Sequence, residues 1–216
     1  MADILVQQGA VTFLDVLGWK GIWQKEKDAI NILHSFVSKI NEQASDITNV
    51  VGNLDGASRG MTTKVLSISD TIAIFTFGDP FHSIKIHAEI CKIAIPESIR
   101  RRLPLRGAIC YGECSIKGNI MVGPAVDEAA SWHEATDWIG VMLTPSAKFQ
   151  LRRNYPAPLV EYSGIPFKKK TDGLNRCVDW EFPDDELYEI FNEMGPYVPE
   201  IAPKYLNTLK FLTRQL

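Results

Sequence analysis

The sequence predicts an α+β domain whose helices cover mainly one face of a mostly antiparallel sheet. Three observations lead to this prediction. Strand-like and helix-like segments alternate in the order β, α, β-hairpin, α, β-hairpin, α, β, α. Residues 64–77 are rich in β-branched side chains and are interrupted by Ser69-Asp70, which is typical of two strands joined by a tight turn. The segments between strands instead repeat apolar residues at helical spacing.

The first half of the chain opens with a strand and a helix. The apolar run 11–16 ends at Gly18, a residue that permits a sharp turn, so we expect a strand that leaves into a turn. Helical spacing then predicts an amphipathic helix over about 22–43. The polar, glycine-containing stretch 49–62 predicts a loop.

The later elements follow from the same patterns. Apolar residues from Ile84 to Ile95 mark a second helix. We then expect strands at 105–111 and 120–122, a helix at 124–134, a strand at 139–143, a helix opened by Thr144-Pro145, strands near 159–162 and 176–180, and helices from 184 onward. We divide the chain into a catalytic domain, 1–182, and a C-terminal helical tail, 183–216, packed on it.

Composition and charge exclude several classes of protein. The net charge of −3 argues against a general affinity for nucleic acid, and we interpret the Arg100–Arg102 and Lys168–Lys170 runs as solvated faces. No stretch is apolar enough to span a bilayer, and the N-terminus lacks the features of a signal peptide, so we expect a cytoplasmic protein without a membrane partner. The four cysteines form no CxxC pair, so oxygen ligands must bind any metal.

Two aspartates lie among apolar residues of predicted neighbouring strands. Asp15 lies in Phe-Leu-Asp-Val-Leu-Gly, and Asp70 lies at the hairpin turn. Each carboxylate either hydrogen-bonds its own turn or binds a metal. Together they could hold two divalent cations about 3.5–4 Å apart, the spacing that serves phosphoryl transfer. Hard oxygen ligands favour Mg²⁺ or Mn²⁺, and a helix start after Gly18 would offer N–H groups to phosphate.

Three motifs in order resemble the class III adenylate and guanylate cyclases. Phe13 to Trp19 is similar to the Phe-x-Asp-[Ile/Val]-x-Gly-aromatic opening of that family. Ser69-Asp70 resembles its second metal aspartate, which usually follows a glycine. Gly123 to Ala130 is similar to Gly-x-x-Val-Asn-x-Ala-[Ala/Ser]. The resemblance covers about residues 10–145 and implies a ferredoxin-like βαββαβ core.

The resemblance also implies a site and an assembly. Asp15, Asp70 and the Val16 carbonyl would hold two Mn²⁺ or Mg²⁺ ions per site, and a nucleoside triphosphate would be the substrate. A chain with one such domain would form a homodimer with composite sites. The nucleotide-binding residues would be Phe13, Leu17, Gly18, Trp19, Lys20, Asp127 and Ser131, of which Asp127 and Ser131 would face the partner's nucleotide.

The departures from the family pattern concern base recognition. Leu66 stands where purine cyclases carry a base-selecting lysine. Ile120 stands where they carry a second polar residue that recognises the base. Asp127 replaces the motif asparagine, and Ser131 replaces the transition-state arginine. Because both metal carboxylates remain, the pattern resembles the pyrimidine cyclases of the bacterial Pycsar antiphage systems, whose product activates a separate effector.

We therefore expect a cyclase that converts UTP, favoured over CTP, to its 3′,5′-cyclic monophosphate. An adenylate or guanylate cyclase with atypical base contacts and a non-catalytic nucleotide sensor are the alternatives. Arg106, on a predicted central strand, would bind the triphosphate unless it forms a structural ion pair. Arg59 could fold over the nucleotide from its loop. Trp132 and His133 are left out of the catalytic set.

Overall fold

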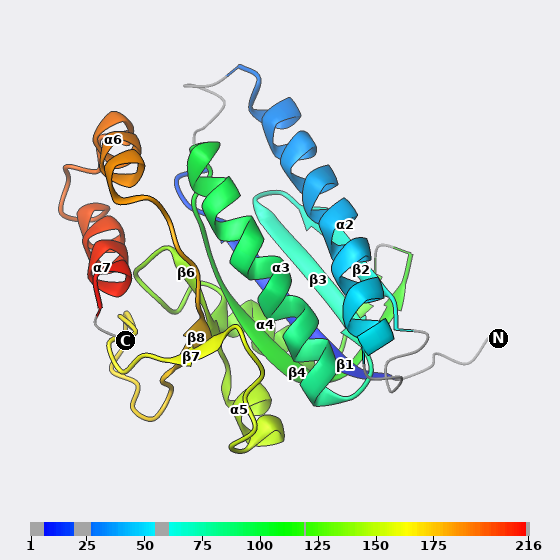
Figure 1. The fold of residues 1–216 in the computed structure, drawn as a ribbon. Helices are drawn as coiled ribbons and strands as arrows, with labels where there is room; N and C mark the ends of the chain where they lie inside the picture. The colour runs from blue at the N-terminus through cyan, green and yellow to red at the C-terminus, as the bar shows by residue number, and fades with distance from the viewer. Residues whose placement is uncertain (1–6, 20–26, 55–60, 119, 215–216) are drawn as a thin grey trace.

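The computed structural model describes residues 7–19, 27–54, 61–118 and 120–214. Its centre is an eight-stranded, mostly antiparallel sheet in the order β2-β3-β1-β4-β6-β8-β7, with β5 paired to β4 (Figure 1). The parallel pair is β4 with β6. The strands are β1 (Gln7–Val16), β2 (Thr63–Ile68), β3 (Thr71–Phe77), β4 (Leu105–Lys117), β5 (Ile120–Val122), β6 (Gly140–Leu143), β7 (Leu159–Glu161) and β8 (Arg176–Val178).

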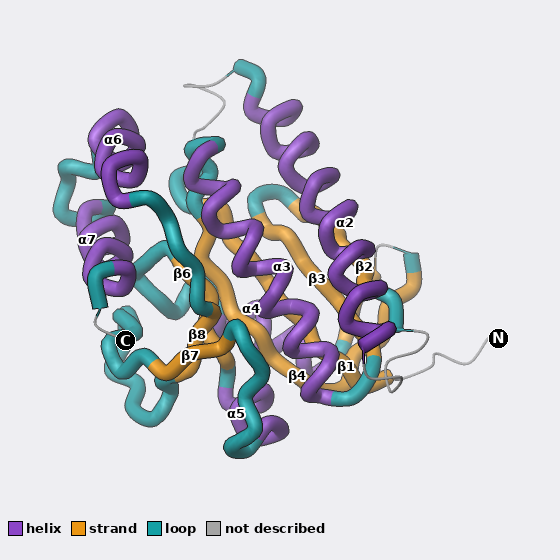
Figure 2. Tube along the Cα trace, in the orientation of Figure 1, coloured by secondary structure: helices purple, strands orange, loops and turns teal. Residues whose placement is uncertain are grey.

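Helices lie on both faces of this sheet. They are α2 (Ala29–Leu54), α3 (Pro80–Arg100), α4 (Pro124–Trp132), α5 (Pro145–Leu151), α6 (Asp184–Met194) and α7 (Ala202–Leu212). The long helices α2 and α3 cross one face, whereas α4 lies behind the sheet (Figure 2). The predicted α+β class and mostly antiparallel sheet are confirmed, and among the described helices α4 lies on the second face.

Alternation along β1 produces the two apolar layers. Leu14 and Val16 join the main core with α2 and α3, while Val11 joins a second buried cluster with Ala125 and Ala129 of α4. Odd-numbered residues of β1, including Asp15, therefore lie on the α4 face.

The predicted extent of the first helix is wrong at its C-terminal end. Residues 22–26 lie outside the described residues, but α2 continues to Leu54 rather than ending near 43. The loop expected over 49–62 is therefore helical at 49–54. The buried stripe of Phe36 and Ile40 continues through Ala44 and Val51, so packing extends the helix despite its polar exposed face.

The C-terminal helices share the main core. Phe191 and Phe211 are buried in it, and the Phe211 ring lies edge-on to Trp138 with centroids 4.9 Å apart. The Thr208 hydroxyl accepts a hydrogen bond from the Ile139 amide at 2.8 Å.

The domain boundary at 182 stays a prediction. Within the described part of the chain, no helix is long and apolar enough to cross a membrane.

Candidate active site

The two predicted metal aspartates lie at the same end of neighbouring strands. In the register of the sheet, Asp15 is opposite Thr71 on β3 and opposite Arg106 on β4. The Val16 amide donates to the Asp70 carbonyl at 3.0 Å, which fixes the β2–β3 turn against the end of β1. Ser69, which precedes Asp70, has φ of +57°, as a tight turn requires. Sequence reasoning placed both residues correctly in the fold.

Asp15 forms a buried ion pair with Arg106. Arg106 Nε and Nη2 lie 2.9 and 2.8 Å from the same oxygen, Asp15 Oδ2, and the two residues are 6–7% exposed. Arg106 Nη1 also donates to the Thr136 carbonyl at 3.2 Å. Burial raises the pKa of the Asp15 carboxyl, and the positive charge of Arg106 offsets part of that rise.

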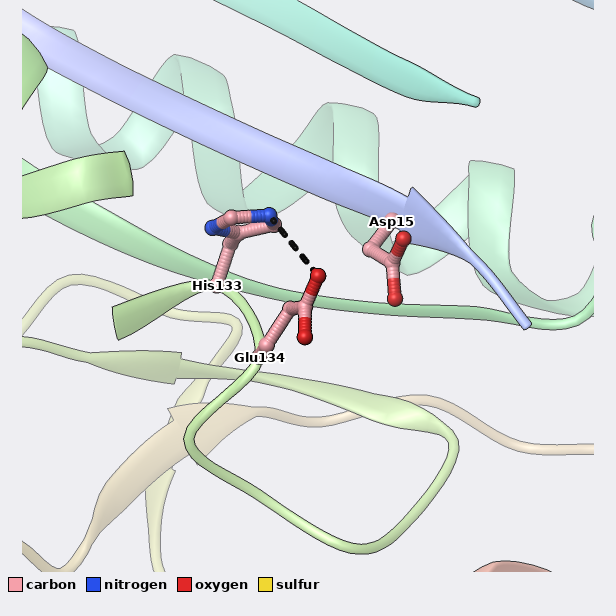
Figure 3. A group of neighbouring side chains, drawn as sticks. All are labelled: Asp15, His133 and Glu134. Atoms are coloured by element: carbon pink, nitrogen blue, oxygen red, sulfur yellow. Dashed lines mark ion pairs between the residues drawn. The ribbon is translucent and has the colours of Figure 1, made fainter. Parts of the chain in front are cut away.

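Two further side chains meet Asp15 from the segment that follows α4 (Figure 3). Glu134 Oε2 lies 3.4 Å from Arg106 Nη2, and Glu134 Oε1 lies 3.7 Å from His133 Nε2. One potential ligand atom from each of Asp15, His133 and Glu134 lies within 4.8 Å of the other two. The sequence prediction omitted both His133 and Glu134. The only signal was their position two and three residues after Ser131, at the end of the third motif.

The donor set of this cluster fits a divalent cation. Carboxylates are ordinary ligands of Mg²⁺ and Mn²⁺, and an imidazole is an ordinary ligand of first-row transition ions. Asp70 is half-buried at the adjacent turn and offers a third carboxylate at this end of the sheet. The residues that would hold metal here are therefore Asp15 and Asp70, with His133 and Glu134 beside Asp15.

The other predicted contacts of the first motif lie around the same strand end. Phe13 is half-buried and packs edge-on to the His133 ring, with centroids 6.0 Å apart. The Leu17 amide donates to the Pro104 carbonyl at 2.8 Å, and Gly18 has φ of +78°, a left-handed conformation that suits glycine. Trp19 is buried. Lys20 and Arg59 lie outside the described residues.

The third motif lies on α4. Asp127 and Ser131 are both exposed, and the Ser131 hydroxyl donates to the Asp127 carbonyl at 2.8 Å. A cavity of about 450 Å³ opens beside this helix and reaches Glu134. It is lined by Ser131, Trp132, Glu134, Ala135, Lys168, Lys169 and Thr171. Aromatic, hydroxyl and cationic groups thus meet next to the Asp15 cluster.

The two positions expected to read the base are apolar here. Leu66, on β2, is half-buried against the second apolar cluster, on the α4 face of the sheet. Ile120, on β5, is 70% exposed. Neither side chain can donate or accept a hydrogen bond.

Solved structures with a similar fold include nucleotide cyclases, although no protein-family model and no curated protein sequence matches the chain. The adenylyl cyclase CyaB from P. aeruginosa aligns with a TM-score of 0.51 and 14% identity, covering 81% of this chain and 95% of that chain. The guanylate cyclase domain of RhGC from Catenaria anguillulae, in complex with GTP, aligns with a TM-score of 0.51 and 14% identity, covering 79% of this chain and 94% of that chain. The adenylate/guanylate cyclase/hydrolase from Silicibacter pomeroyi aligns with a TM-score of 0.53 and 14% identity, covering 80% of this chain and 96% of that chain.

The chain thus shares its fold with these adenylyl and guanylyl cyclase domains. At this identity the likeness concerns the fold alone, and the chemistry depends on the side chains of this chain. What those side chains offer is a carboxylate pair at adjacent strand ends, a buried arginine on one carboxylate, and a cavity with cationic and aromatic lining. This arrangement can bind divalent cations and polyphosphate together.

Proposed function

We propose that the protein is a nucleotidyl cyclase. The observation that carries the proposal is the position of Asp15 and Asp70, which lie at the same end of adjacent central strands of a cyclase-type sheet. The reaction is intramolecular: the ribose 3′-oxygen attacks the α-phosphorus of a nucleoside triphosphate, and pyrophosphate leaves.

The residues of the chain have distinct tasks in this reaction. Asp15 and Asp70, with the Val16 carbonyl, would hold two Mg²⁺ or Mn²⁺ ions. When bound, such ions lower the pKa of an attacking hydroxyl and neutralise phosphate charge. Arg106 is held beside Asp15 and supplies a fixed positive charge close to the triphosphate. Phe13, Leu17 and Trp19 shape the strand end against which the nucleotide lies.

The proposed substrate is a pyrimidine nucleotide, UTP before CTP. Leu66 and Ile120 offer no hydrogen bond to a purine edge, so a purine would leave polar groups unpaired where purine cyclases satisfy them. Trp132, at the cavity beside α4, offers a face on which a base can stack. An adenylate or guanylate cyclase with other base contacts is the alternative within this reaction class.

The proposed biological role is production of a second messenger for antiphage defence. The support is the resemblance to pyrimidine cyclases that act in the cytoplasm on a separate cyclic-nucleotide-binding effector. A non-catalytic nucleotide sensor is the remaining alternative. Retention of both metal carboxylates favours an enzyme, since binding alone would not require two of them.

Product analysis tests the proposal directly. We expect the purified protein, incubated with each ribonucleoside triphosphate and Mn²⁺, to form cyclic UMP or cyclic CMP, identified by chromatography and mass spectrometry. Cyclic AMP or cyclic GMP would support the purine alternative, and tight binding without product would support the sensor.

A single substitution tests the role of the carboxylates. We expect Asp70→Asn to lower the rate at least 100-fold, because it removes a charged metal ligand without changing side-chain size. Asp172→Asn, in the loop before β8, is the matched control and should keep wild-type activity. Full activity of Asp70→Asn would contradict the two-metal proposal.

A further inference from the structure

We propose that His133 and Glu134 are metal-binding residues, and that His133 Nε2 ligates the same cation as Asp15. The inference rests on the proposed function only in that Asp15 holds a metal. It adds a nitrogen ligand from the end of α4 to a site that sequence reasoning built from oxygen alone. It also implies that the site selects a first-row transition ion, such as Mn²⁺, over Mg²⁺.

The first support is that side chains from two separate elements come close together. His133 and Glu134 follow α4, whereas Asp15 lies near the C-terminal end of β1. One potential ligand atom of each residue nevertheless lies within 4.8 Å of the other two (Figure 3). Ligands around an octahedral ion lie roughly 3 Å apart, since each bond is about 2.1 Å long. The Glu134 side chain is 57% exposed and so has room to close this gap.

The second support is the hydrogen bonding of the imidazole. His133 Nδ1 lies 2.9 Å from the Ala130 carbonyl, which can only accept, so Nδ1 carries the proton. In the neutral ring, Nε2 then presents a lone pair, and Nε2 is the atom that faces Glu134. Among the described residues, no group donates a hydrogen bond to Nε2. A histidine whose other ring nitrogen donates to a carbonyl is the usual arrangement at protein metal sites.

The third support is the way in which Arg106 binds. Both of its contacts with Asp15 go to Oδ2, and its contact with Glu134 goes to Oε2. Asp15 Oδ1 and Glu134 Oε1 therefore remain for a cation. Arg106 orients both carboxylates without displacing the ion, as outer-shell partners of metal ligands do.

Charge is also consistent with a bound cation. Asp15 and Glu134 carry two negative charges and Arg106 one positive charge, so the cluster with a neutral His133 has a net charge of −1. A divalent ion changes this to +1, which attracts a triphosphate. A nitrogen ligand favours first-row transition ions over Mg²⁺, which prefers oxygen.

Pulsed electron paramagnetic resonance of the Mn²⁺-loaded protein without nucleotide tests the inference. We expect electron spin echo modulation from one coupled ¹⁴N nucleus, which changes to the ¹⁵N pattern when the protein is labelled with [¹⁵N]histidine. His133→Asn should abolish this modulation and weaken Mn²⁺ binding at least tenfold. Glu134→Gln should weaken binding while keeping the nitrogen coupling.

His82→Asn is the matched control, because His82 lies beside Asp79 and forms another histidine–aspartate pair, with Nδ1 2.9 Å from Oδ2. We expect it to leave the modulation intact. Bound Mn²⁺ without nitrogen coupling, or coupling that survives His133→Asn, would overturn the inference even in an active cyclase. Nitrogen coupling from His133 in a protein that forms no cyclic nucleotide would support the metal site and count against the proposed reaction instead.

Discussion

Arg106 links the charged groups of the candidate site. Its guanidinium contacts Asp15, Glu134 and the Thr136 carbonyl, all from a buried position on β4. The sequence left two roles open for it, a structural ion pair and a triphosphate contact. The structure shows the ion pair, and the triphosphate contact stays a prediction. The two roles are compatible, because a guanidinium offers five N–H donors.

We expect Arg106→Met to destabilise the protein by about 3 kcal/mol at pH 7.5, because it leaves the Asp15 carboxylate buried without a partner. The loss should shrink as the pH falls. The pKa of Asp15 lies above its ordinary value of 3.8, and removing Arg106 raises it further, so protonation in the folded state relieves the cost at low pH.

Urea unfolding of the wild type and of Arg106→Met at pH 7.5 and pH 4.5 measures how this loss of stability depends on pH. Arg102→Met is the control, since Arg102 pairs with Glu193 on the surface and should change stability by about 0.5 kcal/mol or less at both pH values. An Arg106→Met protein as stable as the wild type at pH 7.5 would show that the ion pair contributes nothing.

At the scale of elements, a chain of hydrogen bonds connects two helices and three strands. His87 of α3 bonds Thr12 of β1 at 2.7 Å and Thr76 of β3 at 3.0 Å. Thr76 continues to Thr63 of β2 at 2.7 Å, and Thr63 to Thr48 of α2 at 2.6 Å. This polar path fixes α2 and α3 in register with the strands that carry Asp15 and Asp70.

We expect His87 to make the stability of the protein depend on pH. Complete burial lowers the pKa of its imidazole to about 3, from an ordinary value of 6.5. Because the unfolded chain binds a proton that the folded chain excludes, this contribution to stability is present above pH 6.5. Below that value it falls by roughly 1.4 kcal/mol per pH unit, until the pH reaches the folded pKa.

The variant His87→Leu separates this effect from other titrations. At pH 7.5 it should cost about 2 kcal/mol, because the Thr12 hydroxyl loses its partner in the core. Its stability should then fall less steeply than that of the wild type between pH 6 and pH 4. His34→Leu, at an exposed position of α2, is the control. Equal slopes for His87→Leu and wild type would contradict the prediction.

At the scale of the whole molecule, the proposed homodimer places parts of each site on different subunits. Asp15 and Asp70 belong to one subunit, while Asp127 and Ser131 serve the nucleotide of the other. Both residues of α4 are exposed in the isolated chain, as this arrangement requires, and Ser131 lies at the rim of the cavity beside Glu134 of its own subunit. Two-fold symmetry then gives two equivalent sites per dimer.

Subunit mixing tests this arrangement. We expect Asp15→Asn and Asp127→Ala each to be inactive alone. An equal mixture should recover about a quarter of wild-type activity, since half of the dimers then carry one intact site of two. Mixing Asp15→Asn with Asp70→Asn should recover none, because both changes fall on the same half of each site. Sites contained within one subunit would give no recovery in either mixture.

The sequence by itself determined the order of the main elements and the place of both aspartates, one on a strand and one at a hairpin turn. Strand and helix periodicities are local, so the hairpin at 63–77 and the strand that bears Asp15 could be predicted with their turns. The C-terminal end of α2 could not, because the packing of Ala44 and Val51 on distant residues keeps that segment helical.

Only the tertiary structure decided what surrounds Asp15. The pairing of β1 with β4 puts Arg106 opposite Asp15, and no local pattern specifies that register. The crossing of α4 over the second face of the sheet brings His133 and Glu134 to the same carboxylate. These contacts join residues far apart in sequence, and they arise because burial of α4's apolar face fixes where its last turn ends.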